Sequence, residues 1–290
     1  MTELDSSDVV RVRLDFSYDG SDFQGWAAQP DYRTVQGVME AALAQVIRRT
    51  GPLRLTVAGR TDAGVHARNQ VAHVDMPRWA WERCTSRTVT DPIVALRYKL
   101  WSVLPRDIVI NTISIAQPGF DARFSAMARR YTYRISDRPD TRDPLRRSHV
   151  YWNRKALDID RLNTAALAVT GLRDFAPYCR PRDFATTIRE LHRFSWERPE
   201  AGPDEGLVVA TLEADAFCHS MVRSLVGAVK DVGSGRRDLA WLASHDEYSE
   251  RSPAVSVVPP HGLILESVQY PDDAEMAARA EATRRRRVLD

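Results

Sequence analysis

The densest group of potentially reactive side chains lies in residues 58–66, which read AGRTDAGVH. The glycines on either side of Asp62 permit a tight loop whose backbone can approach a ligand closely. Arg60 can pair with a phosphate or a carboxylate, and Asp62 can act as a nucleophile or a base. The alternative is an Asx turn, in which Asp62 only accepts hydrogen bonds from its own backbone. An isolated motif would favour that turn, but the nine-residue string favours a functional loop.

Two other positions carry side chains that could take part in chemistry. Tyr131 and Tyr133 share one face of a predicted strand, a pattern that usually indicates core packing. Arg223 interrupts an apolar helical segment, and a buried arginine needs a partner, which favours a functional role. Cys218 and His219 could suggest a thiol nucleophile and its base. Adjacent helical residues point in different directions, however, so direct pairing would be poor.

Hydrophobic periodicity predicts the elements that would position these residues. Period-two alternation and short apolar runs predict strands at 10–18, 53–57, 71–74, 108–115, 131–135, 188–196, 207–214 and 262–270. Three-four spacing predicts helices at 34–50, 158–169 and 217–232, with an irregular, partly helical stretch at 76–100. Thr34 can cap the first of these helices. Strands and helices are interleaved, several strands look half-exposed, and there is no Rossmann glycine pattern. The prediction is an α+β sandwich with helices on one face of a sheet.

Composition places the chain among ordinary globular proteins. Its 290 residues are 43% hydrophobic and 28% charged, and no apolar run is long enough to cross a membrane. The first residues lack a secretion signal, so we expect a cytoplasmic protein. Three distant cysteines without CxxC spacing predict free thiols and no zinc site; they are Cys84, Cys179 and Cys218.

The distribution of charge is more informative than the net charge of +2. Almost all the basic residues are arginines, and residues 121–147 hold eight arginines against four aspartates. Arginine binds phosphate with two parallel hydrogen bonds and stacks on bases, so this cluster favours RNA contact. The alternative explanation of the arginine bias is a high-GC genome, which favours arginine codons. The polar stretch 272–290, with Arg284–Arg287, predicts a solvated and partly disordered tail.

The 58–66 string resembles the signature loop of TruA-type tRNA pseudouridine synthases. Four further segments agree with that family in the same order along the chain. They are 18–20 with 25–26, 35–36, 122–126 with 128–133, and 217–223 with 226–227. The resemblance covers about residues 10–270, and chance agreement of several ordered motifs is implausible. Ala27 and Asp215 depart from the commoner pattern, which affects the details of RNA contact rather than the chemistry.

The resemblance implies an activity and roles for particular residues. Family members isomerise uridine to pseudouridine in the anticodon stem-loop of tRNA, at positions 38, 39 and 40, without metal or organic cofactor. It implies that Asp62 is the nucleophile, that Tyr131 stacks on the target base and can move the C5 proton, and that Arg223 pairs with Asp62. It also suggests a set of substrate-binding residues: Arg60, Thr61, His66, Arg129 and Phe217.

The same resemblance implies a fold and partners. The fold is the pseudouridine-synthase fold, two α/β-sandwich halves with a joined, mixed, largely antiparallel sheet and a central cleft. We expect an N-terminal half at 8–118 with the Asp62 loop, a C-terminal half at 119–271, and the tail at 272–290. The expected partners are tRNA and a second copy in a homodimer, with no membrane.

Physical chemistry supports these roles independently of the resemblance. A nearby arginine favours an ionised aspartate in a cleft that excludes water, and an aromatic ring gives a detached base a stacking surface. Two other functions remain as alternatives. A non-catalytic RNA-binding module has no need of a carboxylate such as Asp62 facing anionic RNA. A nucleotide hydrolase using the 59–64 loop would lack both a P-loop lysine and an acidic metal cluster.

Overall fold

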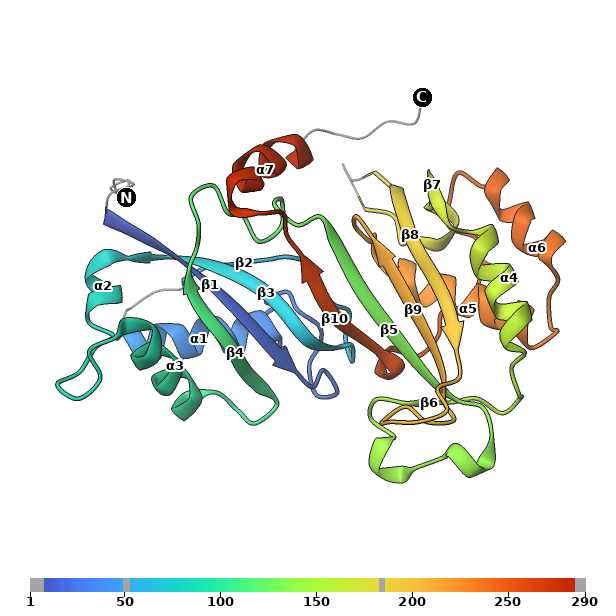
Figure 1. Ribbon diagram of the computed structural model, residues 1–290, viewed down its shortest axis with the longest axis horizontal. Helices are drawn as coiled ribbons and strands as arrows, with labels where there is room; N and C mark the ends of the chain where they lie inside the picture. The colour runs from blue at the N-terminus through green and yellow to red at the C-terminus, as the bar shows by residue number, and fades with distance from the viewer. Residues whose placement is uncertain (1–7, 49–52, 183–185, 285–290) are drawn as a thin grey trace. The chain divides into compact units, whose positions relative to one another are not determined.

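The computed structural model describes residues 8–48, 53–182 and 186–284, and it divides the chain into two compact units (Figure 1). The first unit runs to Ala126 and includes Tyr270–Arg284. The second unit contains Met127–Gln269. The first unit therefore extends beyond the expected boundary at 118, and the segment after Tyr270 returns to it.

The sheet of the first unit is antiparallel. Its central strand, β1 (Val9–Tyr18), lies between β4 (Ile108–Ile115) and β3 (His66–Pro77), and β2 (Leu55–Val57) pairs with β3. Alternate residues of β1 are buried and half-buried, as its period-two sequence predicts. β3 is longer than expected and begins at the last residue of the AGRTDAGVH string.

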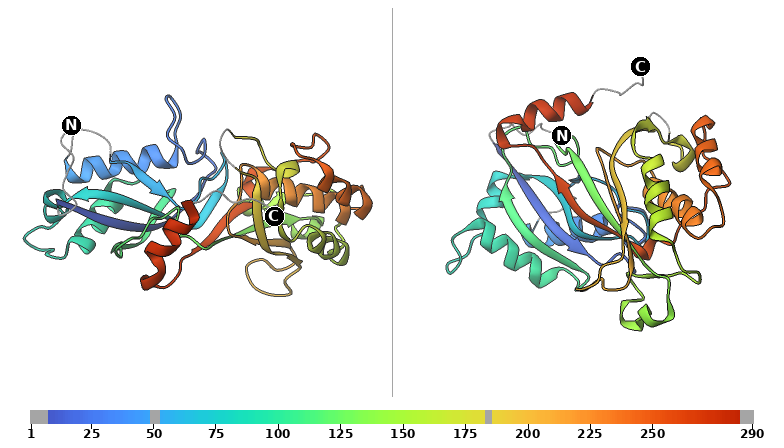
Figure 2. Two further views of the ribbon diagram at one scale, coloured as in Figure 1. Left: turned by 90° about the horizontal axis from the view of Figure 1, so that it is seen from above. Right: turned by 45° about the vertical axis from the view of Figure 1, so that its right-hand side comes forward.

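Three helices precede β4 among the described residues of this unit: α1 (Val35–Ile47), α2 (Arg78–Glu82) and α3 (Pro92–Val103). The predicted cap is confirmed, because Thr34 Oγ1 accepts a hydrogen bond from Gly37 N–H at 3.3 Å. α1 packs against α3 and α3 against β4, so both help to cover one face of the sheet (Figure 2). The stretch expected to be irregular therefore holds two regular helices.

The end of the chain is folded as far as Arg284, contrary to the expected disorder. A short turn, η7 (Asp273–Glu275), leads into α7 (Met276–Arg284). Met276 is 4% exposed, and its carbonyl accepts a hydrogen bond from Ser125 Oγ at 3.3 Å. The polar composition hid this packing because only two side chains of α7, Met276 and Ala280, are buried. Residues 285–287 of the basic run lie outside the described residues.

We expect truncation after Pro271 to destabilise the first unit. Removing α7 exposes the surface that Met276 and Ala280 cover, which should lower the free energy of unfolding by about 2–4 kcal/mol. Urea unfolding of the truncated chain measures this loss, with a chain ending at Arg284 as the matched control. An unchanged unfolding midpoint in the shorter chain would show that α7 adds no stability.

The sheet of the second unit is also antiparallel along its main path. Its strands follow the order β10 (Leu263–Gln269), β5 (Ala128–Ser136), β9 (Val208–Ala214), β8 (Ile188–Glu197) and β7 (Gly171–Asp174). A short strand, β6 (Tyr151–Trp152), pairs parallel to the end of β5. Turns of 3-10 helix connect these elements: η2 (Pro139–Thr141), η3 (Pro144–Arg146), η4 (Ala176–Tyr178), η5 (Ser244–Glu247) and η6 (Pro260–Gly262).

The helices of this unit are α4 (Ile159–Ala168), α5 (Met221–Gly233) and α6 (Leu239–Ala243). α4 packs against both β8 and α5. α5 begins at Met221 rather than at Phe217, since Ser220 has a φ of 65° and cannot continue a helix. Each unit thus combines an antiparallel sheet with packed helices, which confirms the α+β class. No helix within the described ranges is long and apolar enough to span a membrane.

The structure corrects the expectation of three free thiols. Cys179 and Cys218 form a disulfide with their Cα atoms 5.8 Å apart, whereas Cys84 is a buried free cysteine. Burial raises the pKa of the Cys84 thiol. The pair was missed because 39 residues separate the two cysteines in sequence, and only the fold brings the end of η4 beside the start of α5.

Candidate active site

The loop that carries Asp62 occupies residues 58–65, between β2 and β3. Gln70 Nε2 donates a hydrogen bond to Gly59 O at 2.9 Å, which ties the start of the loop to β3. Val65 N–H donates to Asp62 O at 3.2 Å and closes a turn at the end of the loop. The Asp62 side chain is half-buried on a backbone that is held at both ends.

The segment that follows β1 packs directly on this loop. Trp26 N–H donates to Thr61 O at 3.0 Å. Gly25 has a φ of +85°, and a Cβ at this position would lie 3.0 Å from Thr61 O. A Cβ at Gly20 would lie 2.0 Å from Val65 O, so only glycine permits this approach. The two motifs, separate in sequence, form one packed structure.

A buried polar network joins the loop to the ends of β1 and β3. Gln70 Nε2 donates to the Tyr18 hydroxyl at 3.3 Å, and that hydroxyl lies 2.7 Å from Thr61 Oγ1. Burial raises the pKa of Tyr18 to about 12, so the phenol stays protonated at neutral pH and can donate to Thr61. Sequence reasoning missed both Tyr18 and Gln70 as supports. The available signal was a glutamine directly before the apolar run that predicts the strand at 71–74.

His66 connects the end of the loop to the segment after β1. Its Nδ1 accepts a hydrogen bond from Gly20 N–H at 3.0 Å and lies 3.0 Å from Asp19 Oδ1. Since the same nitrogen cannot accept from Gly20 and also donate to Asp19, the backbone hydrogen bond is the contact that holds the ring. Burial opposes ionisation of Asp19, but the hydrogen bonds that Ser21 donates to its carboxylate lower its pKa.

The structure therefore places four of the expected site residues in this loop and at the first position of β3, with different exposures. Thr61 and His66 are buried, Asp62 is half-buried and Arg60 is exposed. The buried pair fixes the backbone, and the exposed arginine remains accessible to an anionic substrate. In the described part of the chain, no three His, Cys, Asp or Glu side chains come close enough to hold a metal ion.

In the second unit, Tyr131 lies on β5 in the interior of the sheet. It is 6% exposed, and its ring meets Phe217 edge-on, with centroids 5.2 Å apart and an interplanar angle of 88°. Tyr133 is fully buried, and its hydroxyl donates to Pro259 O at 2.8 Å. The core-packing interpretation therefore fits Tyr133, and Tyr131 is held by an aromatic neighbour that was itself expected in the site.

The arginines on β5 divide between the two faces, as strand alternation predicts. Arg129 shares the face of Tyr131, is buried, and donates through Nη1 to Asp215 O at 2.5 Å. Arg130 lies on the opposite face and pairs with Glu213 at 2.8 Å. This hydrogen bond fixes the Arg129 side chain against the segment that leads from Asp215 to Phe217.

The arginine cluster is partly neutralised within the chain. Arg134 and Arg146 each lie 2.9 Å from the Asp204 carboxylate, and Arg134 also pairs with Glu266 at 3.1 Å. Burial opposes ionisation of Asp204, but the hydrogen bond and charge of Arg134 outweigh it, so the pKa of Asp204 is lowered. These ion pairs favour a structural role for Arg134 and Arg146 over contact with RNA phosphates.

Arg223 lies in the first turn of α5 and is fixed by the segment beside that helix. Its Nε donates to Val258 O at 2.9 Å, and Val258 N–H donates back to Arg223 O at 3.3 Å. One turn further on, a Cβ at Gly227 would lie 1.9 Å from Ser256 O. This close approach needs glycine, and it holds the segment where it orients the Arg223 guanidinium.

The known proteins most similar in sequence among those compared are tRNA pseudouridine synthases. The family described as tRNA pseudouridine synthase matches residues 165–271. The tRNA pseudouridine synthase A of Streptomyces griseus is 50% identical over 289 residues, covering 100% of this chain and 98% of its own length. The Frankia casuarinae protein of the same name is 51% identical and covers 97% of this chain and 96% of its own length. The Cutibacterium acnes protein, also of that name, is 49% identical, with coverages of 96% and 95%.

A solved structure described as a Cbf5–Nop10–Gar1 complex is a much weaker match. Its TM-score is 0.33 at 9% identity, covering 76% of this chain and 54% of that one, and it carries no argument. The full-length similarity to the three bacterial proteins is decisive, since it spans both units of the chain. The chain belongs to the tRNA pseudouridine synthase family, whose members isomerise uridine to pseudouridine in tRNA.

Proposed function

We propose that this enzyme acts on the anticodon stem-loop of tRNA, at positions 38, 39 and 40, with Asp62 as its nucleophile. The observation that carries the proposal is the rigid support of the Asp62 loop. That loop is held by a backbone hydrogen bond from Trp26, by close contact with Gly20 and Gly25, and by the Tyr18 network. Such preorganisation suits a group that must be placed accurately against a reacting atom.

The reaction needs no net exchange with another reagent. The bond from N1 of uracil to C1′ of ribose breaks, the base rotates, and a bond from C5 to C1′ forms. The C5 hydrogen leaves as a proton, and N1 gains a proton. Asp62 can serve by attack on the base, by attack on the sugar or as a base, and in each case it is regenerated.

Tyr131 and Arg223 complete the proposed catalytic group. Tyr131 stacks on the uracil and assists proton transfer at C5, with Phe217 holding its ring from the edge. Arg223 pairs with Asp62 and favours its ionised form. The Nε bond to Val258 O fixes the plane of that guanidinium.

The remaining expected residues take different parts in substrate binding. Arg60 is exposed and contacts an RNA phosphate. Thr61 and His66 act through the position of the loop, since their polar atoms contact Tyr18 and Gly20. Arg129 and Phe217 shape the space next to the target base. A cytoplasmic homodimer follows from the same resemblance, and sedimentation of the purified protein tests its oligomeric state.

The test of this function is release of tritium from tRNA labelled at C5 of uridine. We expect release from tRNA with uridines at positions 38 to 40 and none from tRNA with cytidines there. An RNA-binding module would bind both tRNAs and release nothing. A nucleotide hydrolase would instead liberate phosphate from nucleoside triphosphates. Release that is equal from both tRNAs would contradict the anticodon-stem assignment.

We expect Arg223→Met to impair catalysis far more than folding. The variant loses the proposed charge partner of Asp62, and the rate should fall by roughly 100-fold for a removed electrostatic contact. Its stability should fall by about 1 kcal/mol, for the hydrogen bond to Val258 O. Single-turnover tritium release and thermal melting measure the two effects. Arg223→Lys, which keeps the charge, should recover part of the rate, and parental activity in Arg223→Met would remove Arg223 from the site.

A further inference from the structure

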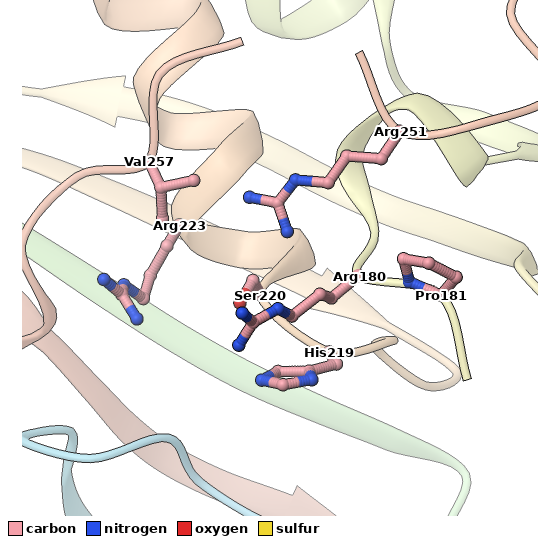
Figure 3. A pocket seen from close by; sticks show the side chains of 7 residues that line it. All are labelled: Arg180, Pro181, His219, Ser220, Arg223, Arg251 and Val257. Atoms are coloured by element: carbon pink, nitrogen blue, oxygen red, sulfur yellow. The ribbon is translucent and has the colours of Figure 1, made fainter. Parts of the chain in front are cut away.

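A pocket of about 820 Å³ lies at the N-terminal end of α5 in the second unit (Figure 3). Its volume is in the range of ligand sites, but its lining is polar and basic rather than apolar. Three arginines and one histidine line it, without any carboxylate: the lining residues are Arg180, Pro181, His219, Ser220, Arg223, Arg251 and Val257. A ligand that fits such a lining is an anion.

Three chain segments form the rim of the pocket, and backbone hydrogen bonds hold them together. Arg180 N–H donates to His219 O at 2.9 Å, which joins the segment after η4 to the start of α5. Ser252 N–H donates to Pro177 O at 3.0 Å, which fixes the residue next to Arg251. The disulfide of this unit joins the first two segments a second time. The rim is therefore a built structure rather than a gap between mobile loops.

Arg180 and Arg251 are the two arginines of the pocket lining to which the proposed catalytic group assigns no role. Figure 3 shows their side chains reaching toward the pocket from different segments. Among the described residues, neither guanidinium has a hydrogen-bond acceptor or a carboxylate within bonding distance, in contrast to Arg134 and Arg146. Like charges that converge without a counter-ion repel each other, and a bound anion relieves that repulsion.

The shape and exposure of the pocket favour a phosphate within a polymer. Arg180 and His219 are exposed, so the pocket opens to the surface and a chain can pass through it. The planar guanidinium matches the two oxygens of a phosphodiester. Arg223, which lines the pocket, is also the proposed partner of Asp62. A phosphate bound there would belong to a nucleotide near the uridine that reacts.

We propose that this pocket is a subsite for an RNA phosphodiester next to the target uridine, with Arg180 and Arg251 as the groups that bind it. The inference rests on the proposed function, since it takes tRNA as the substrate. Arg180 and Arg251 hold the backbone while the uridine is turned out of the stem, a step that costs free energy and needs binding of the flanking phosphates.

The test is equilibrium binding of unlabelled tRNA across a range of salt concentrations, without turnover. Arg180→Gln with Arg251→Gln should weaken binding at least fivefold and flatten the slope of log affinity against log salt by about 0.7 for one single-strand phosphate. Arg237→Gln is the matched control, because this exposed arginine lies beyond the opposite end of α5 and should leave both quantities unchanged. Thermal melting confirms that each variant is folded.

A charge-retaining pair separates phosphate binding from support of the rim. Arg180→Lys with Arg251→Lys should restore the salt slope, and a slope that stays flat in this folded variant would overturn the proposal. A parental salt slope in the glutamine pair would also overturn the proposal, whether or not that pair binds uridine 5′-monophosphate more weakly than the parent. Parent protein that binds tRNA but releases no tritium would contradict the proposed chemistry, while the slope would still decide on the subsite. Parent protein that binds no tRNA would overturn both.

Discussion

Asp62→Asn should abolish isomerisation while leaving the tRNA complex largely intact. Asparagine has nearly the same shape, so the turn closed by Val65 N–H and Asp62 O should persist. Its neutral amide is a poor nucleophile and a poor base. Loss of a residue that makes or accepts a bond in the reaction lowers the rate by roughly 10⁴-fold or more. Affinity should stay within about tenfold, because phosphate contacts supply most of it.

Single-turnover tritium release and tRNA binding measure the two expectations separately. Asp22→Asn is the matched control, since Asp22 is an exposed aspartate in the segment after β1 that packs on the loop. Deamidation of the asparagine variant would regenerate aspartate. Asp62→Ala cannot deamidate and is therefore a second test, and intact-mass analysis detects any deamidated Asp62→Asn protein. Measurable turnover by chemically pure Asp62→Asn would sink the assignment of the nucleophile.

The local parts of the fold could be predicted because local patterns determine them. The alternation of β1 and the cap at Thr34 depend on neighbours within a few residues, and both have the expected form. The Asp62 loop was found as a string with two glycines, and it joins two strands as expected. The contact of that loop with Gly20 was not visible from periodicity, because it depends on how the chain returns to β1.

The features that sequence reasoning missed all depend on partners distant in the chain. α7 looked like a solvated tail because its few buried residues match a surface on another part of its unit. Arg146 looked available to RNA, yet it pairs with Asp204, which is 58 residues away in sequence. The pocket between η4 and α5 likewise combines Arg180 with Arg251, and neither lies in a motif. The clustering of arginines along the sequence therefore does not predict which of them can bind a phosphate.

Gly20→Ala should impair both stability and catalysis, whereas Gly59→Ala should impair neither. A Cβ at Gly20 would lie 2.0 Å from Val65 O, a backbone atom that cannot move without moving the Asp62 loop. Relief of that clash should cost about 3 kcal/mol or more of unfolding free energy. A displacement of the loop by about 1 Å should lower the rate roughly 100-fold. At Gly59, a Cβ would meet nothing within 4 Å, although this glycine lies in the same loop.

Urea unfolding and single-turnover tritium release distinguish the two variants, with release measured at a temperature where circular dichroism shows both to be folded. The stability change in Gly59→Ala should stay within about 0.5 kcal/mol, as for an open surface site. A slow but folded Gly20→Ala protein would show that the catalytic loop needs the contact from the segment after β1. If Gly20→Ala keeps the parental rate and stability, the loop tolerates displacement, and the rigid support that carries the proposed function does not exist.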